Sequence, residues 1–394
     1  MKKEKENSGA RVSFIKKDAE GKRSLSRFGK TVVICLSVII ALIAAIFISV
    51  HALVSYYYGL MEYVDIETET LLDDDEISRY LENMDEDIDP SVTDSHDSKE
   101  IESDVKQDVE KVEQEKESLD GVINILLIGV DNAGVKVWDD KYSNAHNTDA
   151  MIVASINPKT KKIVLTSLMR DTCVQIKKKD GSTAINRLNT AYLYGGYKGM
   201  FDTIGTNLGI DVDRFVQVDF SSFMSIVNIV GGIDIYVTDK EVEQLNKNVW
   251  HLNRLYGYDN GSDMLTDTSS SVKHLNGKQA LAYARIRYLA GSDFARTERQ
   301  RKVIIAVADK IKTLNVSQLN SLFTTLLSKV KTNLTQSECT SYIASAAEYL
   351  SYDIESFRIP DDGTCVDIVL SGREMLKVDF LENYKRWKTL LTSR

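Results

Sequence analysis

The sequence predicts an α/β or α+β domain, with a mixed central sheet flanked by helices and one transmembrane helix before it. Three observations support this fold class. Short apolar, strand-like runs alternate with helical patterns from residue 121 onwards; the turn Asn157-Pro158-Lys159-Thr160 joins two of these runs; and a long uncharged segment precedes them all. Alternation with helices is typical of parallel strands, and a tight turn joins antiparallel ones, so together they indicate a mixed sheet.

The N-terminal segment predicts the topology. Residues 1–30 carry ten Lys/Arg against four Asp/Glu, and residues 31–54 begin with the uncharged run TVVICLSVIIALIAAIFISV. About 20 apolar residues can cross a bilayer, and the basic flank marks the cytoplasmic side. A cleaved signal peptide is the alternative, but its apolar core is shorter and ends at a small-residue cleavage site. We therefore expect an uncleaved, single-pass anchor in the cell membrane, with the N-terminus in the cytoplasm and the rest of the chain extracellular.

Residues 55–120 form an acidic segment. Between residues 61 and 120, 24 Asp/Glu stand against five Lys/Arg, a net charge of −19. Because this composition offers few apolar residues to bury, we predict a mostly disordered extracytoplasmic linker with a transient helix from about Ile101 to Glu117. Residues 121–394 carry 34 Lys/Arg and 30 Asp/Glu, which predicts a mildly basic folded part. We divide it into a domain at 121–315 and a C-terminal helical part at 316–394 that packs on or extends the domain.

The elements of the folded part are predicted in chain order. Val122–Val130 is a buried strand, Met151–Ile156 and Lys162–Leu168 form a hairpin, and Ile185–Leu208 is a loop and helix. Residues 240–275 are an irregular, partly helical insertion. The other predicted strands are Arg214–Asp219, Ile233–Val237, Leu281–Tyr288, Phe357–Ile359 and Val366–Leu370. The other predicted helices are Phe220–Val230, one from about Phe294, Val316–Lys329, Gln336–Leu350 and Phe380–Thr392.

Positive charge is concentrated in residues 281–301. In the predicted strand, Arg285 and Arg287 point the same way because side chains alternate. In the helix that follows, Arg296, Arg299 and Gln300 share a face because residues three and four apart are neighbours. Guanidiniums bind phosphate oxygens in pairs, and a helix N-terminus favours anions. The cluster therefore predicts a phosphate or pyrophosphate site.

Acidic residues offer a second interpretation of this stretch. Asp293, Glu298 and Asp309 are close enough in sequence to neutralise the arginines in a salt-bridged surface helix.

At the strand ends, Asp131 and Asp149 are expected to meet at one sheet edge, where carboxylate oxygens suit Mg²⁺ or Mn²⁺. Roles in turns and helix caps are the alternative for both residues.

The positions of the histidines and cysteines argue against two kinds of active site. The five histidines are scattered and the sequence has no C-x-x-C, so a zinc site or a His-based triad has little support. G-x-x-x-x-G-K-[ST] and G-x-S-x-G are also absent from the sequence. An extracytoplasmic setting permits a Cys339–Cys365 disulfide, but the sequence does not decide whether it forms.

Seven motifs, taken in order, resemble the LytR-CpsA-Psr family of cell-wall glycopolymer transferases. They are NILLIGVD (124–131), NTDAMIVASINP (147–158), VLTSLMRDT (164–172), INRLNTAYLYGG (185–196), VDFSSFMSIVNIVGGIDIYV (218–237), LNGKQALAYARIR (275–287) and DFARTERQR (293–301). The resemblance implies a membrane-anchored, Mg²⁺-dependent phosphotransferase. Such an enzyme attaches a glycopolymer carried on polyprenyl pyrophosphate to peptidoglycan through a phosphodiester.

The resemblance also implies roles for single residues. It gives magnesium to Asp131 and Asp149, and orientation of arginines or proton transfer to Asp171 and Asp293. The implied pyrophosphate contacts are Arg170, Arg285, Arg287, Arg296 and Gln300, with Arg299 on the same stripe, and the implied lipid-tunnel residues are Leu193, Phe220 and Phe223. Either Asp149 or Asp293 serves as the base for the incoming hydroxyl.

Other functions compete with this interpretation. A polyprenyl-pyrophosphate phosphatase and a non-catalytic wall-binding protein would use the same anion cluster. A transcription regulator is disfavoured, because the basic cluster lies beyond the predicted span and the acidic segment, and we expect no nucleic acid partner. The polymer (teichoic acid, capsule or another wall polysaccharide) is not specified by the sequence.

Overall fold

The computed structural model describes residues 15–17, 23–25, 52–69, 71–84, 98–130, 148–287, 292–328 and 330–393. The chain divides into two compact units, residues 1–56 and residues 57–394. In the first unit, β1 (Ile15–Lys17) pairs with β2 (Arg23–Leu25) in antiparallel orientation. The second unit contains the central sheet and the site described below.

A seven-stranded mixed sheet forms the centre of the second unit, in the order β13-β6-β5-β4-β9-β12-β3. β4 pairs antiparallel with β5 and parallel with β9, and β6 pairs antiparallel with β5 and parallel with β13. The mixed sheet predicted from the sequence is therefore confirmed. The strands are β3 (Glu62–Tyr63), β4 (Ile123–Val130), β5 (Thr148–Asn157), β6 (Lys162–Leu168), β9 (Arg214–Asp219), β12 (Lys331–Thr332) and β13 (Asp353–Ile359).

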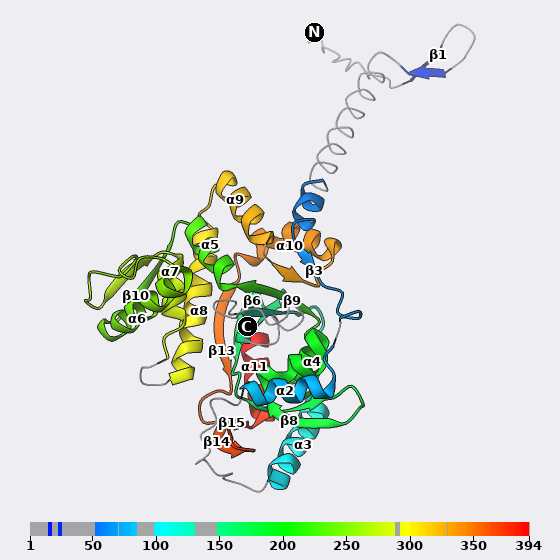
Figure 1. Cartoon of the computed structure of the whole chain (residues 1–394). Coiled ribbons are helices and arrows are strands. Elements are labelled where there is room, and N and C mark those ends of the chain that lie inside the picture. Colours follow the sequence, from blue (N-terminus) through cyan, green and yellow to red (C-terminus); the bar gives the residue numbers. More distant parts are fainter. Residues whose placement is uncertain are drawn as a thin grey trace, which may run out of the picture. The chain divides into compact units, whose positions relative to one another are not determined.

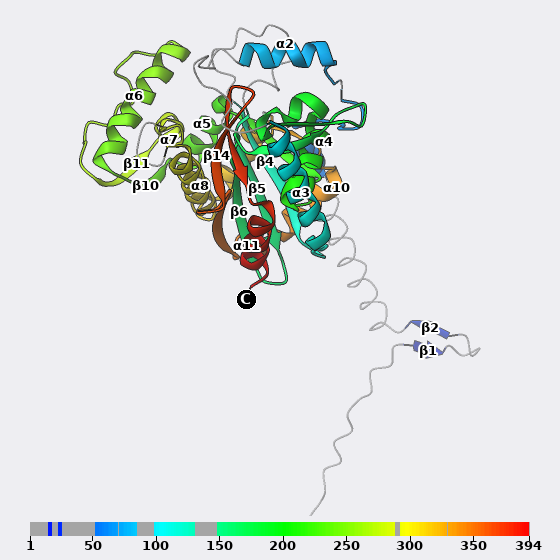
Figure 2. The ribbon, with the colours of Figure 1, turned by 90° about the horizontal axis from the view of Figure 1, so that it is seen from below.

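Both faces of the sheet are covered by helices (Figures 1 and 2). Alternate residues of β4, such as Leu126 and Val130, pack into a core with the helices α3 (Ser98–Glu115), α4 (Ala191–Leu208) and α11 (Phe380–Thr392). The intervening residues, Leu127 and Gly129, face a second layer. That layer is made of α5 (Phe220–Ile229), α7 (Gly277–Ala284) and α8 (Ser292–Ile311).

Smaller elements surround these layers. Three antiparallel pairs are formed by β7 (Cys173–Lys177) with β8 (Thr183–Arg187), β10 (Ile233–Val237) with β11 (Ser271–Leu275), and β14 (Cys365–Leu370) with β15 (Arg373–Val378). Further helices are α2 (Asp74–Met84), the 3₁₀ turn η2 (Leu188–Thr190), α6 (Asp239–Tyr256), α9 (Val316–Leu327) and α10 (Gln336–Tyr349).

The acidic segment is more ordered than its composition predicts. Ile101, Val105, Val109 and Val112 of α3 are all buried in the main core. They recur every three or four residues, so they form one apolar stripe while the charged residues occupy the outer face. The helix predicted from about Ile101 to Glu117 is therefore present as α3, but it packs in the core and is not a transient part of a disordered linker.

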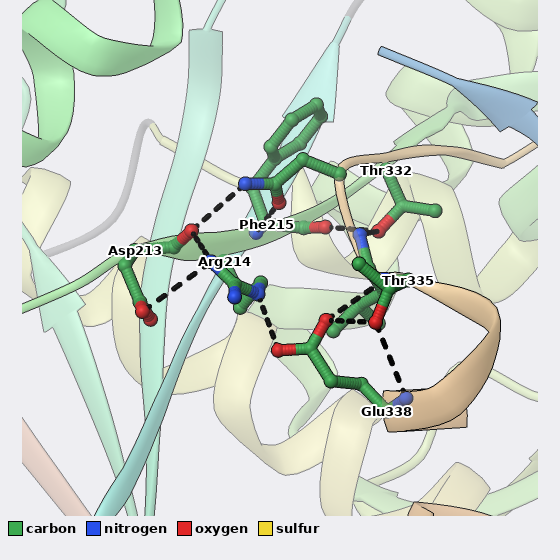
Figure 3. A network of polar contacts seen from close by, with 8 residues as sticks. Asp213, Arg214, Phe215, Thr332, Thr335 and Glu338 are labelled. Atoms are coloured by element: carbon green, nitrogen blue, oxygen red, sulfur yellow. Dashed lines mark hydrogen bonds and ion pairs between the residues drawn. The ribbon is translucent and has the colours of Figure 1, made fainter. Parts of the chain in front are cut away.

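The C-terminal part contributes strands as well as helices. β13 is an edge strand of the central sheet and β12 lies between β9 and β3. Figure 3 shows the polar contacts that join this part to β9. Arg214 Nε donates to Glu338 Oε1 at 2.7 Å, and Thr332 Oγ1 donates to the backbone oxygen of Phe215 at 2.6 Å. The C-terminal part therefore packs against β9 and contributes two strands to the central sheet.

One local prediction is wrong. The stretch predicted as strand Leu281–Tyr288 begins inside helix α7, which a capping box of Asn276 and Gln279 starts. The predicted partly helical insertion at 240–275 contains most of the 18-residue helix α6, followed by an irregular segment and strand β11. Cys339 on α10 and Cys365 on β14 are both free thiols, so the disulfide that the sequence left open is not formed.

In the described part of the chain, no helix combines the length and the apolar character needed to cross a membrane. Residues 31–51 of the predicted span lie outside the described residues.

Replacing Ile101 by Ala tests whether α3 belongs to the folded core. Ile101 is only 2% exposed, and deleting a buried isoleucine side chain costs about 2–5 kcal/mol. We expect the free energy of unfolding, measured by denaturant titration, to fall by that amount. The neighbouring exposed Glu102→Ala is the control and should change little. Equal stability of the two variants would mean that the segment is a spacer after all.

Candidate functional site

A cavity of about 650 Å³ lies between the central sheet and the layer of α5, α7 and α8. Its walls are mainly apolar and come from both layers: Leu127, Ile152, Val216 and Val218 from strands, Phe220 and Phe223 from α5, and Leu281, Val303 and Ile304 from the other helices. Its polar lining includes Arg170, Asp219, Asn248, His251, Arg285, Arg287, Arg296 and Gln300. We call this cavity the anion pocket. Four guanidiniums line a space whose walls are mainly apolar, which fits a ligand with an anionic head and an apolar tail.

Arg285 and Arg287 line the pocket, although the strand predicted to align them does not exist. Arg285 follows the last residue of α7, and its guanidinium carbon lies 4.9 Å from the centre of the Phe220 ring. The position of α7 is set by Gly277, because a Cβ there would overlap the backbone carbonyl of Met224 on α5. Close packing of two helices therefore places Arg285 over the start of α5.

The helix α8 presents a polar turn and then an apolar one to the pocket. Arg296 and Gln300 line it one turn apart, and Val303 and Ile304 continue the same stripe. Arg296 is only 3% exposed. The structure thus brings Arg296 and Gln300 together with the two arginines after α7, as the sequence predicted.

Arg170 reaches the pocket from the end of β6. Its Nε lies 3.3 Å from Asp171 Oδ2, while Arg187 Nε lies 3.6 Å from the other carboxylate oxygen. Asp171 does not itself line the pocket. It is a positioning residue for Arg170, which matches one of the two roles implied for it. Arg187 was not singled out in the sequence, because only the fold brings β8 to the end of β6.

Arg299 is placed outside the anion pocket. Its Nε lies 2.8 Å from Glu241 Oε1 of α6, with side chains only 8% and 12% exposed. Its Nη1 donates to the backbone oxygen of Ile286, between the two pocket arginines that follow α7, at 3.3 Å. The expected pyrophosphate contact is therefore corrected to a structural role. Only one face of α8 lines the pocket. Arg299 lies on a different face of the helix, which contacts α6.

Leu193 is also corrected. It is 1% exposed and belongs to the core on the α4 side of the sheet, whereas the pocket lies on the opposite face. Phe220 and Phe223, the other two residues expected to hold lipid, do line the pocket. The sequence showed that Leu193 was apolar, but the face that a helix covers is a property of the tertiary structure.

Acidic residues lie at the end of the sheet where β4, β5 and β9 meet the pocket. Val130 pairs with Thr148 on one side and with Asp219 on the other, with an irregularity between Gly129 and Val130. This register places the backbone of Asp149 at that edge, as predicted. Asp131 lies outside the described residues, and the side chains of Asp149 and Asp293 are likewise not described. Asp219, a pocket carboxylate that the sequence analysis missed, caps α5 by accepting from Ser222 N at 2.7 Å.

Comparison with known proteins decides the family. The LytR_cpsA_psr family model matches residues 90–391. The chain belongs to this family. The match includes α3 and the C-terminal strands, so the LytR-CpsA-Psr domain extends well beyond the motifs at 124–301.

Named relatives are similar over part of their length. The polyisoprenyl-teichoic acid–peptidoglycan teichoic acid transferase TagU of Enterococcus faecalis is 33% identical over 232 residues, covering 57% of this chain and 67% of the relative. Biofilm regulatory protein A of Streptococcus mutans is 31% identical over 269 residues, covering 64% and 61%. For TagV of Bacillus subtilis, 30% identical, the matched part is 49% of the relative. The chain thus spans about half to two thirds of these relatives.

Solved structures share the fold. TagT bound to LI-WTA has 25% sequence identity and a TM-score of 0.53, covering 70% of this chain and 94% of TagT. Protein gbs0355 of Streptococcus agalactiae has 28% identity and a TM-score of 0.53, covering 72% and 90%.

The Arg299–Glu241 pair generates a pH-dependent prediction. Burial raises the pKa of Glu241, but hydrogen bonds from Thr238 and Arg299 outweigh it and hold the pKa below its usual value. The ionised carboxylate therefore stabilises the fold above the ordinary pKa of a glutamate, and this contribution is lost as the pH falls through the lowered value. We expect Glu241→Gln to be less stable than the wild type at neutral pH, and the difference to shrink in acid. Denaturant titration at several pH values measures it; a constant difference would contradict the assignment.

Proposed function

We propose that this LytR-CpsA-Psr protein is a membrane-anchored, extracytoplasmic phosphotransferase. It takes a glycopolymer carried on polyprenyl pyrophosphate and attaches it to peptidoglycan through a phosphodiester. The observation that carries the proposal is the anion pocket, in which four guanidiniums line a cavity with apolar walls. The name of TagU, which describes transfer of teichoic acid from a polyisoprenyl carrier to peptidoglycan, supports it. TagT, a structural neighbour, binds LI-WTA.

The pocket suits both parts of such a donor. Its apolar walls, including Phe223, Val303 and Ile304, accommodate an isoprenoid chain, and its guanidiniums face the pyrophosphate. As a hydroxyl oxygen of the acceptor bonds to the phosphorus that carries the polymer, the bond from that phosphorus to the bridging oxygen breaks. Polyprenyl phosphate leaves with the bond electrons. Negative charge grows on the bridging and non-bridging oxygens, where the arginines stabilise it.

The hydroxyl proton needs an acceptor. A carboxylate near the attacking oxygen takes this proton as the new bond forms. Asp149 and Asp293 remain the proposed bases. Asp149 follows Thr148, which pairs with Val130 at the sheet end, and Asp293 is in the first turn of α8, which carries Arg296.

A divalent metal ion belongs to the proposal. Carboxylate oxygens are the donors that Mg²⁺ and Mn²⁺ prefer, and the strand register places Asp149 at the sheet end that Asp131 follows. These two residues would hold the ion, which when bound adds positive charge beside the phosphate oxygens. Residues 31–54 are proposed to anchor the protein in the cell membrane with the pocket outside, and no nucleic acid partner is proposed.

The double variant Arg285→Ala/Arg287→Ala tests the pocket. Removing one preorganised donor of developing charge costs about 10²–10³-fold in rate, so we expect transfer from a polyprenyl-pyrophosphate glycan to peptidoglycan fragments to fall at least that far. The full-length protein in detergent, with product phosphodiester measured by mass spectrometry, provides the assay. Lys302→Ala is a matched control, because it removes an exposed cation paired with Glu298 on the outer side of α8.

The reaction products of this assay distinguish a transferase from a phosphatase. A phosphodiester conjugate supports the transferase, whereas free polyprenyl phosphate alone would indicate a phosphatase. Near-normal transfer by a folded double variant would refute the role of the two arginines.

Metal removal tests the second part of the proposal. We expect EDTA to abolish transfer and added Mg²⁺ or Mn²⁺ to restore it in the wild type. Asp149→Asn should need a higher metal concentration to reach half of its own maximal rate, because an amide oxygen binds the ion more weakly than a carboxylate. Transfer that proceeds unchanged in EDTA would remove the metal from the mechanism.

A further inference from the structure

A second cavity lies against α6, beside the anion pocket. It has a volume of about 750 Å³ and we call it the α6 groove. Its lining residues are Asp239, Lys240, Glu243, Asn246, Lys247, Trp250, His251, Met264 and Thr268. His251 lines both the groove and the anion pocket, so the two spaces adjoin at this side chain. A ligand in the groove would therefore adjoin the space that the guanidiniums line.

The far wall of the groove is held in place by polar contacts. The side-chain amide of Asn246 donates to Leu265 O at 3.0 Å and accepts from Leu265 N at 2.8 Å. Asn253, fully buried, donates to Ser262 O at 2.8 Å, and Lys278 Nζ lies 2.7 Å from Asp263 Oδ2. The segment that carries Met264 and Thr268 is thus fixed to α6 and α7. The groove is a preformed feature, which lowers the entropic cost of binding.

The chemistry of the groove differs from that of the anion pocket. Asp239 and Glu243 balance Lys240 and Lys247, and the pair Glu243–Lys247 is joined at 2.7 Å. Balanced charge does not select a polyanion, but it offers many hydrogen-bond donors and acceptors. Trp250 adds a half-buried aromatic ring, and the guanidinium carbon of Arg254 lies 4.8 Å from the centre of that ring. Stacking of the guanidinium on the indole restrains its orientation.

We propose that the α6 groove binds a glycan, the sugar units that flank the reacting phosphate. Sugar rings have apolar C–H faces that pack on aromatic rings, and hydroxyl and amide groups that bond to charged and amide side chains. The proposal rests on the function proposed above and adds where that reaction holds its sugars. Two sources share this chemistry: the peptidoglycan strand that accepts the polymer, and the polymer on the lipid donor.

Trp250→Ala in the full-length protein is the test. The binding probes are lipid-free peptidoglycan glycan fragments, a polyprenyl pyrophosphate without sugar, and the same lipid carrying a short glycan. Loss of a buried aromatic contact is expected to weaken glycan binding roughly tenfold and to leave binding of the sugar-free lipid unchanged. Tyr236→Ala is the control, because Tyr236 is a 59% exposed aromatic residue on β10 outside the groove.

The comparison of the probes identifies the source of the glycan. A loss confined to the peptidoglycan fragments assigns the groove to the acceptor, and a loss confined to the glycan-bearing lipid assigns it to the donor. Trp250→Phe, which retains a ring, should recover most of the affinity. Wild-type protein that binds neither glycan, or a folded Trp250→Ala variant that binds both normally, overturns the proposal. Failure of the wild type to bind the sugar-free lipid would instead count against the proposed function. Binding of the peptidoglycan fragments would still test whether the α6 groove holds a glycan.

Discussion

The burial of both faces of the seven-stranded sheet is the constraint on which this structure depends. Parallel strand pairs, such as β4 with β9 and β6 with β13, are typical of sheets whose two faces are both covered. On one side, α3, α4 and α11 fill the space with a dry core. On the other side, α5, α7 and α8 leave an opening whose apolar floor is the sheet itself. The lipid-compatible part of the pocket is therefore a direct consequence of the layering.

The arginines of α8 show how position decides the role of a charge. Arg296 lines the anion pocket, whereas Arg299 forms a buried ion pair with Glu241 and supports the backbone between Arg285 and Arg287. Arg301 faces the sheet, where its Nη1 donates to Ser167 Oγ at 2.7 Å. Burial, together with the nearby Arg358, lowers its pKa to about 10. In the anion pocket, bringing four guanidiniums into a mainly apolar space costs free energy, and binding of an anionic ligand would offset that cost.

Much of the architecture follows from local patterns in the sequence. The strand β4 was evident as an apolar run, and helix α8 as a charged stripe that continues into an apolar one. The errors have physical causes. The alternation of Arg285 and Arg287 imitated a strand although helix formers and a capping box precede it, and the high charge of residues 61–120 concealed the apolar stripe of α3. β12 has two residues and gives almost no signal, because its stability comes from its neighbours.

The sequence by itself determined which chemistry this protein carries. The order of the motifs was sufficient for the family, and the spacing of the arginines was sufficient to predict that Arg285, Arg287 and Arg296 lie around one space. Only the tertiary structure decided which side chains share a space. It separated Arg299 from Arg296, placed Leu193 behind the sheet, and brought Asp219 and His251 to the pocket. The reason is that periodicity fixes the direction of a side chain relative to its own helix or strand, whereas the packing of layers fixes what that side chain meets.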